Sequence, residues 1–149
     1  MKKFNFSLQK VLEIKEQILE SLRMEMSNFN HEKRQIELDI RNLNMKYATA
    51  NTELNEKSSK SITVGEMLYY KMYMENIFKN IEDKQKEKEA IDKKIEAKRR
   101  EIVDVNKEIS SLEKLKEKEL DKYKYELDKK EEIYIEEFVS NNKILKQYV

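Results

Sequence analysis

The sequence contains no cysteine and no proline, and Gly65 is its only glycine. Sheet proteins need glycine and proline at many turns, so sandwiches, barrels and βαβ folds are nearly excluded. The lack of cysteine removes disulfides and thiolate metal ligands, and His31, the only histidine, leaves no pair of imidazoles for a metal or catalytic site. A single glycine also excludes a glycine-rich loop that cradles phosphates. Long helices remain as the expected structure.

Positive and negative charges almost balance, with 31 Lys and Arg residues against 30 Asp and Glu residues. The net charge of +1 gives no bulk attraction to nucleic acid or anionic lipid. No stretch reaches the roughly 18 apolar residues of a membrane span, and polar residues interrupt the N-terminus where a signal peptide would need an apolar run. We therefore expect a cytoplasmic protein.

Apolar residues recur every three or four positions along most of the chain. In the first half this seam follows positions 4, 8, 11, 15, 18, 22, 25, 29, 32, 36, 40, 43, 47, 50 and 54. The alternation slips once there, between positions 32 and 40, whereas in the second half it is regular from Met67 to Leu112. A spacing that averages about 3.5 residues over several heptads indicates a coiled coil.

One segment breaks the helical pattern. Residues 55–65 gather serines, a threonine and the only glycine, and these residue types favour caps and turns over helix interiors. Thr63 and Glu66 fit a capping box, and Ile62 and Met67 fit the hydrophobic staple that accompanies it. A helix is therefore predicted to begin directly after Thr63.

Two helices joined by so short a turn lie antiparallel. The predicted fold class is all-α, a long two-helix antiparallel coiled-coil hairpin whose second helix is longer than the first. We expect a single domain over residues 1–149, with helix 1 at about 7–57, the turn at about 58–63 and helix 2 at about 64–146. In this register Leu8 lies opposite Glu113, so roughly the last thirty residues have no partner helix.

These last residues are nevertheless rich in apolar side chains at helical spacing: Leu120, Tyr123, Leu127, Tyr134, Phe138, Ile144 and Leu145. Leaving such side chains in water forgoes roughly 1.5–3 kcal/mol each, so an uncovered apolar face marks a contact surface. Two interpretations stay open: a partner protein binds the tail, or the tail bends back on the hairpin or frays.

Aromatic and methionine residues cluster at the start of the second helix. Residues 67–78 read M-L-Y-Y-K-M-Y-M-E-N-I-F, and these side chains cover too much of the helix circumference to face one partner helix. Off the seam, such residues are typical of interface centres. We expect a second docking site here, with a locally broader core as the alternative.

Catalysis has little support in the sequence. Carboxylates are numerous but belong to faces predicted to be exposed, and no cleft is predicted that would shift their pKa values. We therefore expect no enzyme, no cofactor and no metal site.

Two motifs resemble a known family. The N-terminus reads Phe4-x-Phe6-x-Leu8-x-x-Val11-Leu12-x-x-Lys15, and the second helix opens with V-G-E-M-L-Y-Y-K-M-Y-M. Together with the chain length and the single break near residue 60, they resemble the flagellar export protein family FliJ. The resemblance implies a non-enzymatic antiparallel coiled coil of the flagellar type III protein export apparatus, similar to the central stalk of rotary ATPases.

The resemblance also implies partners. The paired terminal end of the hairpin would enter the pore of the hexameric export ATPase FliI and promote its assembly and activity. Another surface would meet the cytoplasmic domain of the export gate protein FlhA and couple the ATPase to the gate, and export chaperones would be bound for recycling. The protein would lie at the inner face of the cell membrane at the flagellar base, touching the membrane only through the gate, without nucleic acid or a small-molecule substrate.

Site residues follow from the same resemblance. By position, the gate-binding face falls on Tyr73, Ile77, Asn80 and Lys84. For the export ATPase we expect contacts from Phe6, Leu12, Lys15, Tyr123, Leu127 and Tyr134. Lys15 is notable from physical chemistry alone, because a charge in an apolar seam either snorkels to solvent or meets an acidic group.

Two other functions fit the same helices. One is the equivalent ATPase stalk of a virulence injectisome, with the same fold in a different machine. The other is a structural coiled-coil spacer or a prefoldin-like holdase, whose hairpin tips or tail would bind many clients.

Overall fold

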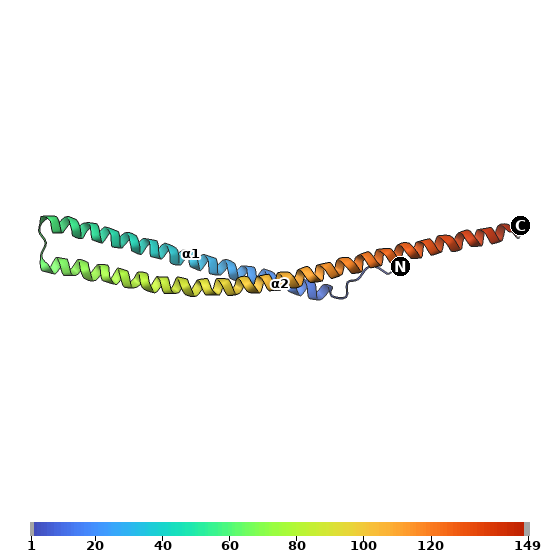
Figure 1. The fold of residues 1–149 in the computed structure, drawn as a ribbon, viewed down its shortest axis with the longest axis horizontal. Helices are drawn as coiled ribbons and strands as arrows, with labels where there is room; N and C mark the ends of the chain where they lie inside the picture. Colours follow the sequence, from blue (N-terminus) through green and yellow to red (C-terminus); the bar gives the residue numbers. More distant parts are fainter. Residues whose placement is uncertain (1, 148–149) are drawn as a thin grey trace. The chain divides into compact units, whose positions relative to one another are not determined.

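A computed structural model describes residues 2–147 of the 149-residue chain. It contains two helices, α1 (Gln9–Lys60) and α2 (Val64–Gln147), joined by residues 61–63 (Figure 1). The two helices pack against each other and α2 is the longer one, which confirms the predicted all-α hairpin. The sequence placed the end of the first helix near residue 57, whereas α1 continues to Lys60 and leaves a connection of only three residues.

The chain divides into two units. The loop unit is Glu20–Val103, and it contains the connection together with the parts of α1 and α2 that flank it. The terminal unit comprises residues 2–19 and 104–147, in which the beginning of α1 packs against the second half of α2. In each unit the core is the single row of apolar side chains between the two helices.

The start of α2 is fixed by local hydrogen bonds. The backbone N–H of Glu66 donates to Oγ1 of Thr63 at 3.1 Å, and the N–H of Met67 donates to the Thr63 carbonyl at 3.0 Å. Thr63 is therefore the N-cap that the sequence predicts, because its hydroxyl satisfies one of the free donors of the first turn. Gly65 lies in this first turn without a positive φ.

The seam of α1 differs from the predicted one over its first half. Leu12 and Leu19 are buried, whereas Val11 and Ile18, which the prediction placed in the seam, are 41% and 39% exposed. Each buried leucine directly follows an apolar neighbour, so the sequence pattern alone fits either position. The predicted seam is wrong by one residue here.

The predicted slip between positions 32 and 40 is also wrong. Within the loop unit the covered positions 22, 26, 29, 33, 36, 40 and 43 alternate without interruption, and Glu25 and Glu32 are exposed. This path leaves both glutamates in solvent and takes in Lys33, whose aliphatic stem can cover the seam while its ammonium pairs with Asp92 at 2.6 Å. The hydrogen bond to Asp92 raises the pKa of Lys33.

The seam of α2 follows the prediction. Tyr70, Ile77 and Ile91 are buried in the loop unit, and Ile109 is buried in the terminal unit. Met67, the first predicted member, is 37% exposed. Apolar neighbours such as Tyr69 and Phe78 lie directly beside Tyr70 and Ile77, but they are exposed and the predicted positions are the covered ones.

Ion pairs between α1 and α2 show which residues of the two helices lie opposite each other. In the terminal unit, Nζ of Lys15 lies 2.6 Å from Oε2 of Glu108. The predicted register places Asn106 opposite Lys15, so the observed pairing is shifted along α2. The shift follows from the later end of α1. Because α1 ends at Lys60 instead of near residue 57, each residue of α1 lies opposite a residue further along α2 than predicted. In the loop unit Lys98 pairs with Glu25 in the same manner.

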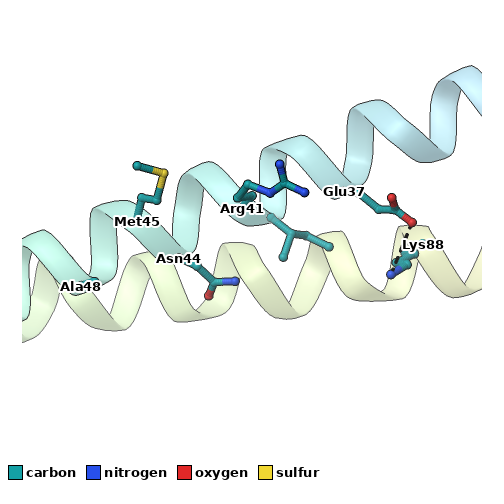
Figure 2. Close-up of a pocket in the computed structure, with 7 residues that line it drawn as sticks. Glu37, Arg41, Asn44, Met45, Ala48 and Lys88 are labelled. Carbon is teal, nitrogen blue, oxygen red and sulfur yellow. Dashed lines mark ion pairs between the residues drawn. The ribbon is translucent and has the colours of Figure 1, made fainter.

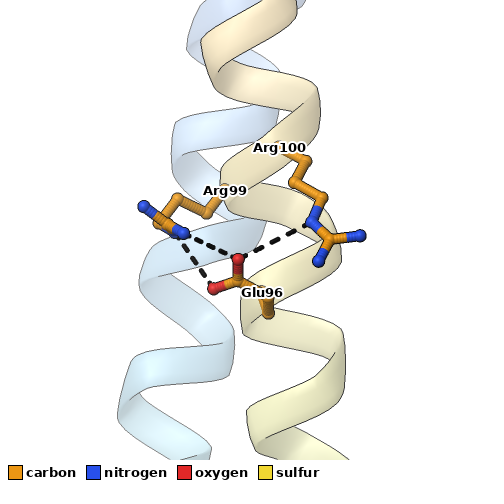
Figure 3. Close-up of polar contacts among 3 residues, drawn as sticks. All are labelled: Glu96, Arg99 and Arg100. Carbon is orange, nitrogen blue, oxygen red and sulfur yellow. Dashed lines mark hydrogen bonds and ion pairs between the residues drawn. The ribbon is translucent and has the colours of Figure 1, made fainter.

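Charges along α2 also pair within the helix. Figure 3 shows Glu96 between two arginines: Nη2 of Arg99 donates to its Oε1 at 2.7 Å, and Nε of Arg100 lies 3.6 Å from the same oxygen. The hydrogen bond from Arg99 lowers the pKa of Glu96, and the positive charges of both arginines act in the same direction. Such exposed pairs stabilise the helix modestly, and they keep the outer face of α2 polar.

Candidate partner-binding surfaces

In the terminal unit, an extended segment precedes α1 and lies on α2. We call residues 2–8 the N-terminal strap. The hydroxyl of Tyr123 donates to the backbone carbonyl of Lys2 at 2.6 Å, and the rings of Phe4 and Tyr123 have centroids 5.6 Å apart. Phe6 is only 4% exposed. Leu8 is half-buried as well, so the strap is held by three apolar side chains and the hydrogen bond from Tyr123.

The junction of strap and helix is fixed as well. The N–H of Gln9 donates to the carbonyl of Phe6 at 3.1 Å, and Nζ of Lys116 donates to Oε1 of Gln9 at 2.8 Å. Gln9 thus links the first turn of α1 to α2.

Leu120, Tyr123 and Leu127 are half-buried in this part of the terminal unit, so the expectation that nothing in the chain covers them is wrong.

The rest of α2 is different. We call residues 128–147 the tail, and every residue in it is exposed in the described structure. Its apolar members are Ile133, Tyr134, Ile135, Phe138, Val139, Ile144 and Leu145, each at least 45% exposed. The prediction of an uncovered apolar surface is confirmed for this shorter segment. Because α2 continues as helix to Gln147, the tail does not turn back on itself.

All six residues expected to contact the ATPase lie in the terminal unit. Phe6 and Leu12 are buried at 4% exposure each, and Tyr123 and Leu127 are half-buried. Lys15 was expected either to snorkel or to meet an acidic group, and it pairs with Glu108 of the same chain. Tyr134 is 70% exposed, so it is the one of the six whose ring stands free on the described surface.

A second apolar surface lies in the loop unit. We call it the loop-end patch, and its members are Val64, Leu68, Tyr69, Met72, Tyr73 and Phe78, which are 40–76% exposed. The rings of Tyr69 and Tyr73 are nearly parallel, with centroids 6.4 Å apart. Tyr70 turns inward, where its hydroxyl donates to Oε2 of Glu53 at 3.2 Å. The aromatic cluster therefore supplies both a buried seam residue and an exposed patch.

Grooves between the helices adjoin this patch. One of about 470 Å³ is lined by Tyr69, Tyr70 and Tyr73 of α2 and by residues of α1 that include Met45. Figure 2 shows a second groove of about 640 Å³, with Met45 again in its lining and the Glu37–Lys88 pair, 3.6 Å apart, at the other end. Met45 is 63% exposed and shared by both grooves, so the apolar surface continues from α2 onto α1.

The four residues expected to bind the gate do not share one exposed face. Tyr73 is 40% exposed and Asn80 is exposed, but Ile77 is buried in the seam at 4%. Lys84 pairs with Glu87 at 3.3 Å and with Asp39 at 3.5 Å. The hydrogen bond to Glu87 raises the pKa of Lys84, and Asp39 acts in the same direction.

Two features of these surfaces were not predicted from the sequence. Phe4 was placed in the seam, but residues 2–8 were not expected to form a separate segment held on α2 through Lys2, although apolar residues at alternating positions 4, 6 and 8 are a signal of an extended segment with one buried face. Met45 was not assigned to any surface, because one exposed methionine on a helix carries no pattern.

Within residues 2–147, no group of three or more His, Cys, Asp or Glu side chains could hold a metal ion. The described helices also include none with a segment long and apolar enough to span a bilayer.

The described structure is a helical hairpin with uncovered apolar surfaces on both of its units, and such surfaces are typical of protein–protein contacts. The comparison with known families makes this specific. The family described as "Flagellar FliJ protein" matches residues 4–147, and the chain belongs to this family. Membership implies a role associated with flagellar export. No curated protein and no solved structure matches the chain.

Proposed function

We propose that the chain is a non-enzymatic stalk of the flagellar type III export apparatus, whose tail enters the pore of a FliI-type ATPase ring and promotes ring assembly and activity. The observation that carries this proposal is the exposed apolar tail at the end of α2. Family membership associates the chain with flagellar export, and the tail is the surface proposed to contact the ATPase.

The distribution of apolar residues on the tail favours a ring over a single helix as partner. Ile133, Tyr134 and Ile135 are consecutive and all at least 49% exposed. Successive residues of an α-helix point about 100° apart, so these three side chains face widely different directions. One partner helix covers a single stripe, whereas a pore surrounds the helix. The tail is therefore suited to an enclosing site.

The six residues expected at the ATPase then have different roles. Tyr134 contacts the ring directly, since its ring is 70% exposed. Phe6, Leu12 and Tyr123 keep the strap and the start of α1 packed on α2, and so set the shape of the end that enters the pore. Lys15, through its ion pair with Glu108, and the half-buried Leu127 belong to the packed part of the terminal unit.

The loop-end patch is proposed to bind the cytoplasmic domain of an FlhA-type export gate, which would place the protein in the cytoplasm at the flagellar base. Tyr73 and Asn80 contact the gate directly, Lys84 borders the contact, and Ile77 supports it from the core. Binding at both units would couple the ATPase to the gate. Export chaperones are a third class of partner, for which the same exposed surfaces are available.

The test measures turnover of the export ATPase with substoichiometric amounts of the chain. We expect wild type to stimulate turnover and Tyr134→Ala to abolish most of the stimulation, because the tail loses its most exposed aromatic contact. Tyr125→Ala is the matched control, since Tyr125 is 65% exposed, lies in the same unit and precedes the tail. Wild type without effect on turnover would contradict the stalk function, and equal loss in both variants would contradict the role of the tail.

A further inference from the structure

The tail has one face that continues the packed face of α2. Leu127, Tyr134 and Leu145 are spaced by 7 and 11 residues, and Phe138 follows Tyr134 by four. These spacings are close to whole numbers of helical turns, so the four side chains share one side of the helix. Leu127 is half-buried, whereas Tyr134, Phe138 and Leu145 are 58–70% exposed.

Beyond its first three residues, Asp128, Lys129 and Lys130, the tail carries charges in two groups. The glutamates Glu131, Glu132, Glu136 and Glu137 come first, and the last turns carry Lys143 and Lys146. Two tails side by side in parallel would bring the glutamates of both chains within about one Debye length, roughly 8–10 Å, of each other. An antiparallel pair instead places the acidic segment 131–137 of each tail near the lysines at the end of the other.

The positions of Glu131 and Lys146 indicate how two antiparallel tails would be aligned. At 100° per residue, Glu131 and Lys146 flank the same edge of the Tyr134–Phe138–Leu145 face. In an antiparallel pair related by a two-fold axis, equivalent edges face each other. When Phe138 lies near its counterpart on the axis, Glu131 of each chain lies beside Lys146 of the other.

We propose that the free chain forms a dimer in which the tails of two copies pair antiparallel through Tyr134, Phe138 and Leu145, with Glu131 and Lys146 forming two equivalent intermolecular ion pairs. The occupant of this face in the absence of other proteins is a second copy of the chain. A self-paired tail cannot enter a ring, so pairing limits ATPase binding at high concentration. That consequence rests on the proposed function, whereas the pairing itself does not.

The first test is sedimentation equilibrium of the full chain at concentrations up to about 100 μM, a range that detects association in the micromolar regime. We expect wild type to show a monomer–dimer equilibrium and Phe138→Asp to remain monomeric. Tyr125→Asp, which changes a tyrosine just before the tail on the opposite side of α2, should dimerise as wild type does. Wild type that stays monomeric, or Phe138→Asp that dimerises like wild type, would overturn the proposal.

The second test exchanges charges. Glu131→Lys and Lys146→Glu should each weaken dimerisation roughly tenfold, because like charges replace both opposite pairs. A 1:1 mixture of the two variants should restore association, since each lysine then faces a glutamate. No weakening in either variant, or no restoration in the mixture, would overturn the antiparallel pair.

These outcomes are separate from those of the ATPase assay. A chain that stimulates the ATPase but never dimerises refutes only the pairing. A chain that dimerises, but leaves ATPase turnover unchanged even at concentrations at which it is monomeric, refutes only the stalk function.

Discussion

Two neighbouring segments of α2 in the terminal unit carry similar apolar residues and have opposite surroundings. Residues 104–127 lie against the strap and the start of α1, and their seam residues are buried or half-buried. Residues 128–147 have similar helical spacing, but all of them are exposed. Periodicity therefore identifies a face that is fit for contact, and it does not tell whether the contact lies within the chain or outside it.

The largest expected difference between the two segments is in stability. Leu12 is 4% exposed and packs in the covered part of the terminal unit, whereas Leu145 is 64% exposed in the tail. Leu12→Ala should lower the free energy of unfolding by about 2–3 kcal/mol through lost burial and the cavity it leaves. Leu145→Ala should change it by less than about 0.5 kcal/mol. Urea unfolding followed by circular dichroism measures both, and equal effects would show that the tail is packed as firmly as the seam.

A smaller difference tests the corrected seam of α1. Leu19 is 8% exposed and its neighbour Ile18 is 39% exposed. Leu19→Ala should therefore destabilise the chain by about 1–2 kcal/mol more than Ile18→Ala, because more apolar area returns to water. Melting temperatures of the two variants give the comparison. A larger loss for Ile18→Ala would restore the seam predicted from the sequence.

The strap should respond to the loss of one hydroxyl. Tyr123→Phe removes the hydrogen bond to the Lys2 carbonyl and should loosen residues 2–8 by about 1 kcal/mol, while helicity stays unchanged. Amide hydrogen exchange of Gln9, whose N–H donates to the Phe6 carbonyl of the strap, should accelerate correspondingly. Tyr125→Phe is the control, and equal acceleration in both variants would contradict the anchoring role of Tyr123.

The smallest effect concerns pH. The pKa of Glu96 lies below its ordinary value of 4.5 because Arg99 hydrogen-bonds to the carboxylate. The stabilisation is therefore fully present above pH 4.5 and is lost as the pH falls through the lowered pKa of the folded state. Glu96→Gln should lower the melting temperature slightly at neutral pH, and the difference from wild type should shrink as the pH falls below 4.5. An unchanged difference between the two chains across this range would rule out a contribution from the ionised pair.

How much of this arrangement the sequence could reveal depends on how local each signal is. Thr63 and Glu66 are three residues apart, and the helix start they predict is the one observed. The seam of α1 was misplaced because Val11 and Leu12 are both apolar, so that only packing decides between them. The uncovered tail was predicted from the unequal lengths of the two helices, and it is shorter than predicted because Leu120, Tyr123 and Leu127 are half-buried.

The parts that sequence reasoning missed depend on distant partners. Lys2 and Tyr123 are far apart in the chain, and no local pattern announces their hydrogen bond. Ile77 was assigned both to the seam and to the expected gate-binding face, and only its burial at 4% shows that it faces inward. Met45 joins Tyr69 and Tyr73 in one groove because the turn brings the two helices together.

Hydrogen–deuterium exchange of the two segments of α2 tests the central claim most directly. It is measured at low chain concentration, with and without a FliI-type ATPase and a non-hydrolysable nucleotide. The account predicts that residues 128–147 become protected when the ring is present, while residues 104–127 are already protected and change little. Unchanged exchange in residues 128–147 in the presence of an assembled ring would contradict it.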